Sequence, residues 1–171
     1  MNKTMHGAQW RRLEASDLAA INSIADIVHA NYPEDEAILL ERLALYPDGC
    51  FILARENNPV GYIISHPWQF GQPPELNSLL NSIPDPATTY FIHDIALLPI
   101  ARGTGAASAM IPNLMRHAAT ARLPNVSLVA VNNSMEFWER HGFRVFEDPS
   151  LGTKLSSYDE DARFMFRSVP A

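Results

Sequence analysis

The residues of this chain best suited to chemistry lie in the segment 90–108, where a strand pattern leads through a glycine-containing loop into a helical pattern. The strand pattern ends at Leu98-Pro99, and Arg102, Gly103 and Gly105 precede the helix. The first amides of a helix lack partners within the helix and carry partial positive charge, and glycine lets an anion approach the backbone. The spacing therefore predicts a phosphate or pyrophosphate site. The alternative is an ordinary turn whose glycines supply only backbone freedom.

Two common phosphate motifs do not fit this loop. A P-loop needs Gly-Lys-Ser/Thr, but Gly105 is followed by Ala106-Ala107. A dinucleotide-binding fingerprint needs a third glycine or an alanine at position 108, where this chain has Ser108. It also needs an acidic residue at the end of the next strand, where this chain has Asn132. Both motifs are therefore excluded.

The loop resembles instead the acetyl-CoA-binding motif of the GNAT acyltransferase family, Arg/Gln-x-x-Gly-x-Gly/Ala, through Arg102, Gly105 and Ala107. Residues 132–143 resemble the family's short helix that ends in aromatic-Glu-Lys/Arg-x-Gly-Phe. The resemblance implies direct transfer of acetyl from acetyl-CoA, as cosubstrate, to a primary amine without a covalent enzyme intermediate. The acceptor would be a small molecule, with a protein N-terminus or a lysine as further options. The alternatives are a non-catalytic acyl-CoA-binding sensor or interaction module of the same fold, and a phosphate-binding domain unrelated to coenzyme A.

The resemblance also implies which residues hold the cosubstrate. Backbone groups of the strand would bind the pantetheine and thioester, and Arg102 with the loop amides would hold the pyrophosphate. Asn132 and Asn133 lie one or two positions from the family's cofactor-binding asparagine, with a solvated turn as the alternative role. The implied cofactor-binding residues are Ile95, Ala96, Leu97, Arg102, Gly103, Thr104, Gly105, Ala106, Ala107, Ser108, Asn132, Asn133 and Trp138.

Transfer to an amine requires a proton acceptor, because an alkylamine with a pKa of ~10.4 is roughly one part in a thousand neutral at pH 7. His93 and Asp94 are the candidates on the strand beside the thioester. Successive strand side chains point to opposite faces, so only one of the two is expected to face the cleft. Relatives with a histidine on this strand favour His93, and the backbone N–H of Leu97 is a candidate oxyanion donor. Alternatively, His93 is a hydrogen-bonded sheet residue and Asp94 a surface carboxylate.

The proton donor for the departing thiolate is left open. Many family members have a tyrosine where this chain has Trp138, whose indole N–H does not titrate usefully. Tyr158, in the polar loop 148–162, or water could serve instead. Cys50 is expected to be a buried core thiol.

Other polar residues give no further site. His6, His29, His66, His117 and His141 form no metal-binding motif, so no metal is predicted. The acid runs Glu34–Glu36 and Asp159–Asp161 are expected to be solvated charges, or else to attract a cationic amine. Aromatic residues that could line the acceptor site are Tyr62, Trp68, Phe70 and Tyr90.

Hydrophobic periodicity predicts the elements that position these residues. Helices are expected at 17–29 with Ser16 as N-cap, from Pro33 to Leu45, at 106–121 and at 134–141. Strands are expected at 10–13, 50–55 and 60–65 with a turn at 57–59, and at 89–98, 126–131, 143–147 and 163–167. This order agrees with an α/β (α+β) fold of the GNAT type. The resemblance implies a mixed, mostly antiparallel central sheet of about seven strands that is flanked by helices. It also implies that strands 89–98 and 126–131 splay apart at the cofactor site.

The 171 residues match one domain, with a flexible N-terminus at 1–7 and a proline-rich insertion at 67–88. This insertion encloses a short segment whose apolar residues have helical spacing. Thirteen Lys+Arg against nineteen Asp+Glu give a net charge of -6, which argues against partners such as nucleic acid or an anionic membrane. One cysteine and no apolar run long enough for a leader or a membrane span favour a cytoplasmic protein. The oligomeric state is left open between monomer and homodimer.

Overall fold

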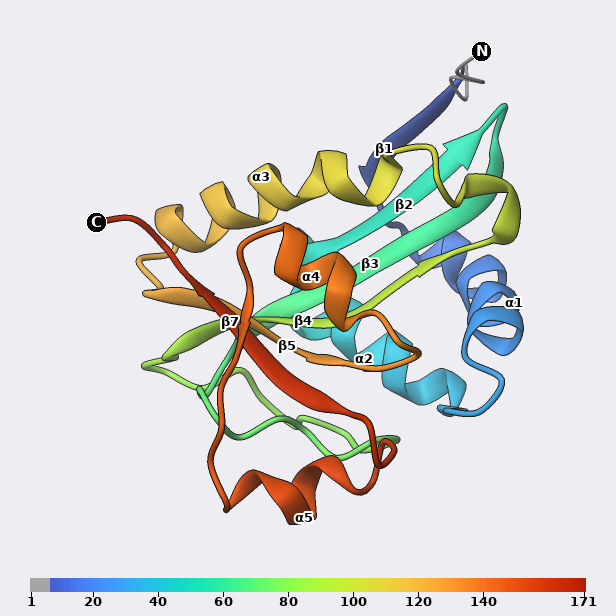
Figure 1. Ribbon diagram of the computed structural model, residues 1–171. Coiled ribbons are helices and arrows are strands. Elements are labelled where there is room, and N and C mark those ends of the chain that lie inside the picture. Colours follow the sequence, from blue (N-terminus) through green and yellow to red (C-terminus); the bar gives the residue numbers. More distant parts are fainter. Residues whose placement is uncertain (1–6) are drawn as a thin grey trace.

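Residues 7–171 are described by the computed structural model, and within them seven strands form one sheet in the order β1-β2-β3-β4-β5-β7-β6 (Figure 1). Neighbouring strands are antiparallel except for the parallel pair β4 and β5. This confirms the predicted fold class. The predicted flexible N-terminus lies outside the described residues apart from Gly7. The strands are β1 Ala8–Arg12, β2 Cys50–Arg55, β3 Asn58–Trp68, β4 Thr89–Leu97, β5 Asn125–Ala130, β6 Arg144–Val145 and β7 Arg163–Ser168.

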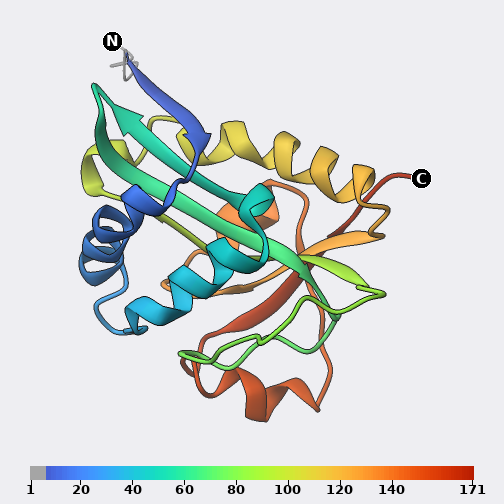
Figure 2. The same cartoon turned by 180° about the vertical axis from the view of Figure 1, so that it is seen from behind.

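The helices cover both faces of the sheet. Side chains of β4 and β5 pack with α3 and α4 on one face, while α1 and α2 pack on the other face against β2 and β3. Figure 2 shows the blue and cyan ribbons of α1 and α2 in front of the sheet, with the yellow ribbon of α3 above it. No helix in the described part of the chain has the length and apolar character needed to cross a membrane. The α-helices are α1 Leu18–Val28, α2 Glu36–Leu45, α3 Ala106–Thr120, α4 Met135–Arg140 and α5 Leu151–Leu155.

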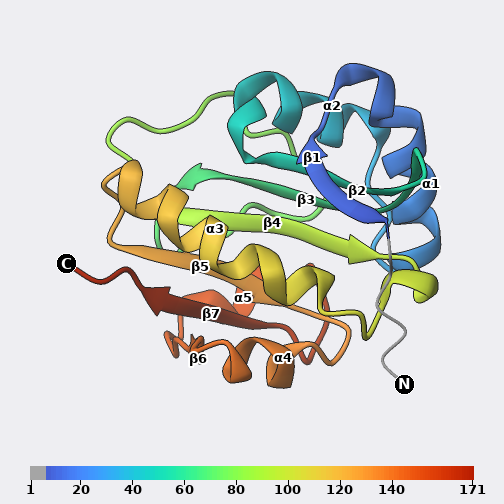
Figure 3. The same cartoon turned by 90° about the horizontal axis from the view of Figure 1, so that it is seen from above.

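The sheet divides between β4 and β5. Their pairing covers only Tyr90, Phe91 and Ile92 of β4, opposite Val126, Ser127 and Leu128 of β5. Beyond this point β4 and β5 continue without pairing with each other, and Figure 3 shows them diverging toward their carboxyl ends. The remainder of β4 therefore has an unpaired edge facing a gap.

A β-bulge interrupts β4 at the predicted catalytic residues. Ile92 pairs with Ser65 and Asp94 pairs with Ile64, so His93 is an extra residue without a partner across β3. Such a bulge shifts the alternation of side chains by one position. His93 and Asp94 therefore point to the same side, toward α1 and α2.

Helix starts and the hairpin turn differ from expectation. Ser16 is not an N-cap, because the carboxylate of Asp17 accepts the N–H of Glu14 and closes a 3₁₀ turn before α1. Pro33 lies before α2, whose N-cap is Asp35. The β2–β3 turn consists of Glu56 and Asn57 (φ 50° and 65°), because two residues with positive φ match the twist of paired strands.

The proline-rich insertion also differs from expectation. Its first residues belong to β3, and the described residues 69–88 contain no helix. The prediction of a short helix in this segment is wrong, because backbone amides of the loop donate to carboxylates and not to the carbonyls of a helix. Glu41 accepts the N–H groups of Leu80 and Asn81, and Glu34 accepts that of Asn77. The strand predicted at 143–147 shrinks to two residues, and α5 was not predicted.

His66, at the buried end of β3, makes stability depend on pH. Burial lowers its pKa to about 3, and its ring bonds to the carbonyl of Pro67 at 2.9 Å. Below pH 6.5 the imidazole is protonated in the unfolded chain, whereas in the folded protein it stays neutral down to about pH 3. The free energy of unfolding therefore decreases as the pH is lowered from 6.5 toward 3. We expect acidification from pH 6.5 to 5 to cost roughly 2 kcal/mol through this residue. Urea unfolding at several pH values measures the slope.

The matched variant for this measurement is His66→Asn, whose amide keeps a donor for Pro67. It should flatten the pH dependence between 6.5 and 5 even if its stability at neutral pH is lower. An unchanged slope would assign the acid sensitivity to other groups.

Candidate active site

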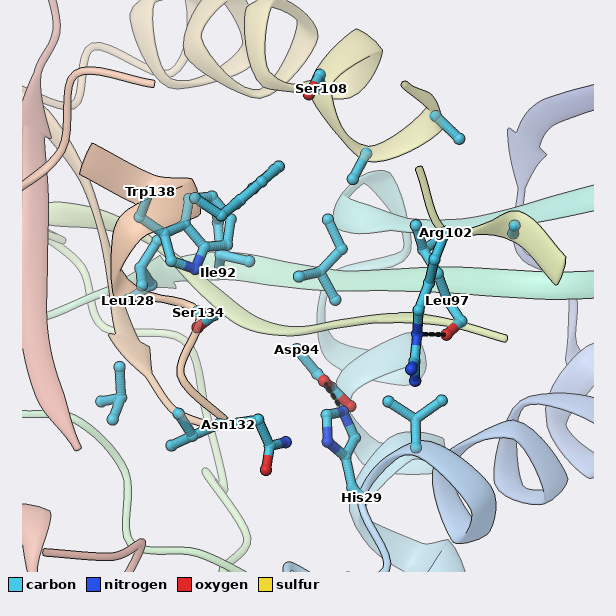
Figure 4. A pocket seen from close by; sticks show the side chains of 18 of the residues that line it. His29, Ile92, Asp94, Leu97, Arg102, Ser108, Leu128, Asn132, Ser134 and Trp138 are labelled. Atoms are coloured by element: carbon cyan, nitrogen blue, oxygen red, sulfur yellow. Dashed lines mark hydrogen bonds and ion pairs between the residues drawn. The ribbon is translucent and has the colours of Figure 1, made fainter. Parts of the chain in front are cut away.

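A cavity of about 790 Å³ occupies the gap between β4 and β5 (Figure 4). Its walls come from both strands, from the loop before α3, from α4 and from the end of α1. The residues lining it are Val28, His29, Ile92, His93, Asp94, Ile95, Leu97, Ala101, Arg102, Gly103, Gly105, Ala106, Ala107, Ser108, Leu128, Val129, Val131, Asn132, Ser134, Phe137, Trp138 and Arg140.

At one end of the cavity, the loop before α3 forms an open backbone cradle. Gly103 and Gly105 have φ of 71° and 82°, and a Cβ at either position would meet no atom within 4 Å. Glycine is therefore required at these two positions by the positive φ and not by lack of space for a side chain. Thr104 does not line the cavity, because its hydroxyl bonds to Ala101 O and to the amide of Ala106. These two hydrogen bonds hold the loop so that the start of α3 faces the cavity.

Two cations border the cavity. Arg102 donates from Nε to Leu97 O at 3.1 Å, and Figure 4 shows its side chain beside Asp94 and His29. Arg140 lies on α4 and was not predicted. Its signal in the sequence was its place at the Lys/Arg position of the second motif. Positive charge is thus placed locally despite the negative net charge of the chain.

The edge of β4 presents backbone groups to the gap. Leu98 N–H donates to Val60 O on β3, and because N–H directions alternate along a strand, the N–H of Leu97 points away from β3. The same alternation turns Ile95 toward the gap and Ala96 toward β3. Ala96 accordingly does not line the cavity, and its side chain packs in the core under α1.

The far wall holds the second sequence motif. Trp138 is buried and lines the cavity, and Ser108 bonds to His141 at 3.0 Å, which ties α3 to α4. Asn132 lines the cavity, whereas Asn133 does not. Both asparagines have positive φ, in the turn that follows β5.

Two histidine–carboxylate pairs lie on the α1 and α2 side of the cavity. His93 Nε2 is 3.0 Å from Glu34 Oε1, and His29 Nε2 is 2.6 Å from Asp94 Oδ1. The other oxygen of Asp94 accepts the hydroxyl of Tyr62. Both predicted strand residues face this side, so the expectation that only one faces the cleft is wrong, because the bulge removes the alternation.

Charge pairing governs the protonation of these groups. Burial acts to raise the pKa of Asp94, but the neighbouring His29 and the hydroxyl of Tyr62 lower it below its usual value. Burial acts to lower the pKa of His29, yet the Asp94 carboxylate raises it overall. Similarly, His93 lowers the pKa of the buried Glu34. Both carboxylates are therefore ionised at neutral pH, and that of Asp94 favours the protonated form of His29.

Other candidates from the sequence lie elsewhere. Tyr158 donates its hydroxyl to Pro74 O at 2.6 Å and does not line the cavity. Tyr90 and Phe70 pack in the core, and Cys50 is buried with its pKa raised to about 12 by burial. In the described residues, no group of three potential ligands could hold a metal ion.

Sequence reasoning did not assign Glu34, Tyr62 or His29 to the catalytic groups around His93 and Asp94. Glu34, expected to be a solvated charge, is 13% exposed and bonded to His93 and Asn77, so that expectation is wrong. Tyr62 was named only as a possible lining residue. His29 was set aside, although it continues the buried stripe of α1 one turn beyond Ala25 and so gave a usable signal.

Known proteins share this architecture. The loading GNATL domain of CurA from Lyngbya majuscula superimposes with a TM-score of 0.79 at 14% identity, over 95% of this chain and 98% of that chain. Ard1 from Thermoplasma volcanium gives a TM-score of 0.71 at 17% identity, over 96% and 99% of the two chains. Arabidopsis thaliana Naa50, in complex with the bisubstrate analogue CoA-Ac-MVNAL, gives 0.69 at 11% identity, over 95% and 99%.

At these identities the structural likeness shows the fold. A search of curated proteins finds no match to the chain. The model of the acetyltransferase (GNAT) family, however, matches residues 15–143, which include both motifs and both strands that border the cavity. The chain therefore belongs to the GNAT acetyltransferase family.

Proposed function

We propose that this protein transfers an acetyl group from acetyl-CoA to a primary amine of a small molecule by direct attack. The observation that carries the proposal is the continuity of the cavity, which joins the backbone cradle at α3 to the histidine–carboxylate pairs through the unpaired edge of β4. An anion site, an extended channel and proton-accepting groups then lie in the order in which a pyrophosphate, its pantetheine arm and a thioester would require them.

The residues present fit acetyl-CoA. Helix amides and open glycines suit a pyrophosphate, and the backbone groups of Ile95 that point into the gap suit the amides of pantetheine. The volume of 790 Å³ lies in the range of small-molecule sites, roughly 300–1,000 Å³. The thioester would supply an activated acyl carbon, and Leu97 N–H would stabilise charge on its oxygen.

A proton acceptor completes the proposal. Because Asp94 accepts hydrogen bonds at both oxygens, an imidazole is the better acceptor. His93 is the candidate from the sequence: Glu34 engages its Nε2 and leaves Nδ1 without a protein partner. We retain the cytoplasm as the proposed location. A protein N-terminus or a lysine is the alternative acceptor. The structure of Naa50 contains the bisubstrate analogue CoA-Ac-MVNAL.

Trp138 keeps a second function open, that of a non-catalytic acyl-CoA sensor, because the indole supplies no titrating proton for the thiolate. Isothermal titration and thiol release separate the functions. We expect micromolar binding of acetyl-CoA, and release of free thiol with at least one member of a panel of primary amines. Binding without thiol release would favour the sensor. Binding of nucleotides but not of pantetheine compounds would overturn both.

A further inference from the structure

We propose that His29, held by Asp94, is the catalytic residue that takes the proton from the acceptor amine. The inference rests on the proposed function and changes its proton acceptor from the residue that the sequence favoured. Figure 4 shows the His29 ring and the Asp94 carboxylate pointing toward one another at the edge of the cavity, with Arg102 alongside.

The pairing fixes which nitrogen is free. With Asp94 ionised, His29 donates its Nε2–H to Oδ1 at 2.6 Å, and Nδ1 of the neutral ring carries the lone pair. Tyr62 donates to the second oxygen of Asp94, so the carboxylate is held from two sides. This is the arrangement by which a carboxylate orients an imidazole base and stabilises the imidazolium that forms.

Accessibility distinguishes His29 from the other candidates. The side chain of His29 is 15% exposed, whereas that of His93 is 4% exposed and its Nδ1 is fully enclosed. Asp94 has both oxygens engaged, and Tyr158 bonds to Pro74 outside the cavity. Of the candidates considered, His29 alone combines a free nitrogen, a carboxylate partner and access from the cavity.

From the neutral amine, formed when the bound ammonium loses one proton to water, the step balances with one further proton. The amine nitrogen forms a bond to the acyl carbon, the carbon–sulfur bond breaks, and sulfur keeps the electron pair. One proton passes from nitrogen to Nδ1 of His29, and its transfer from His29 to sulfur restores the neutral imidazole. The Asp94 carboxylate, which raises the pKa of His29, favours the first of these transfers.

The charged groups that face His29 come from several elements. Asp94 on β4 and Glu34 before α2 raise its pKa, and Arg102 from the loop before α3 lowers it. Asp26, on α1 itself, lines a second, small cavity together with His29 and Tyr62. Because the net effect raises the pKa of His29, the acidic limb of the pH–rate profile is expected above pH 6.5.

The test compares His29→Ala with His93→Ala in the full chain, using acetyl-CoA and an amine that the wild-type protein acetylates. We expect His29→Ala to lower kcat by about 10²–10⁴-fold, to leave acetyl-CoA affinity within a few-fold, and to lose the acidic limb. Added imidazole should restore part of the rate in His29→Ala but not in His93→Ala. A structural role would not respond to imidazole.

Two results of this comparison would overturn the assignment of His29. Rescue of His93→Ala alone, or an unchanged rate in His29→Ala, would overturn the assignment while leaving the proposed function standing. Binding of acetyl-CoA with no transfer by the wild-type protein would overturn both. If His29→Ala fails to fold, His29→Gln keeps an amide donor for Asp94 and should show the same loss of kcat without the ability to be rescued.

Discussion

Asp94→Asn is expected to lower the rate of acetyl transfer by about 10²–10⁴-fold, with acetyl-CoA affinity changed no more than a few-fold. The asparagine keeps the size of the side chain but removes the charge that favours the imidazolium of His29. Its amide can accept from only one of the two donors, His29 or Tyr62, and presents N–H groups to the other. Steady-state kinetics with circular dichroism as a check on folding measure the effect.

Two matched variants separate charge from geometry. Asp26→Asn removes a carboxylate from the exposed side of α1, close to the same histidine, and should leave the rate within about two-fold. Tyr62→Phe removes one hydrogen bond to Asp94 but preserves the ion pair, so its loss should be milder. A folded Asp94→Asn protein with the native rate would show that the His29–Asp94 pair is structural.

The alternation rule failed at this residue for a local physical reason. From the sequence, His93 and Asp94 were expected on opposite faces of the strand, so that only one of them would face the cleft. One extra residue in β4 brings both side chains to the α1 side. Bulges are enriched beside active sites, but nothing in the residues 90–97 marks one, because the insertion exists only relative to the partner strand.

Features that depend on neighbouring residues were predictable. The glycines of the loop, the helix that follows and the apolar strands follow from local conformational preferences, and they placed Arg102, Gly103, Gly105, Ser108 and Trp138 around one cavity. His29 and Glu34 reach the site across 65 and 59 positions of chain. Their partners depend on how α1 and the segment before α2 pack on the sheet, which no spacing in the sequence encodes.

The loop 69–88 illustrates the same limit in energetic terms. Leu76, Leu79, Leu80 and Ile83 have the spacing of a helix, but the carboxylates of Glu34 and Glu41 offer its amides charged acceptors. Hydrogen bonds to ionised groups are stronger than those to helix carbonyls, so tertiary partners override the periodicity. Because Glu34 also holds His93, the loop and the catalytic side of the cavity share one carboxylate.

Gly105→Val is expected to weaken acetyl-CoA binding by roughly 10–100-fold, the loss of about one charge-assisted contact at the cradle. A valine resists the φ of 82° at this position, and its methyl groups would fill the space that a phosphate needs. Since a Cβ there meets no protein atom within 4 Å, packing does not oppose the change. Isothermal titration with acetyl-CoA measures the loss.

Gly71→Val is the matched control, because this glycine has a φ of 74°, an equally open Cβ position and no place in the cavity lining. Both variants carry the same kind of backbone strain, on the order of 1–3 kcal/mol, and should lose similar stability in urea unfolding. Only Gly105→Val should also lose affinity. Equal affinity in the two variants would place the pyrophosphate elsewhere, whereas loss in Gly105→Val alone ties the binding energy to the backbone at the start of α3.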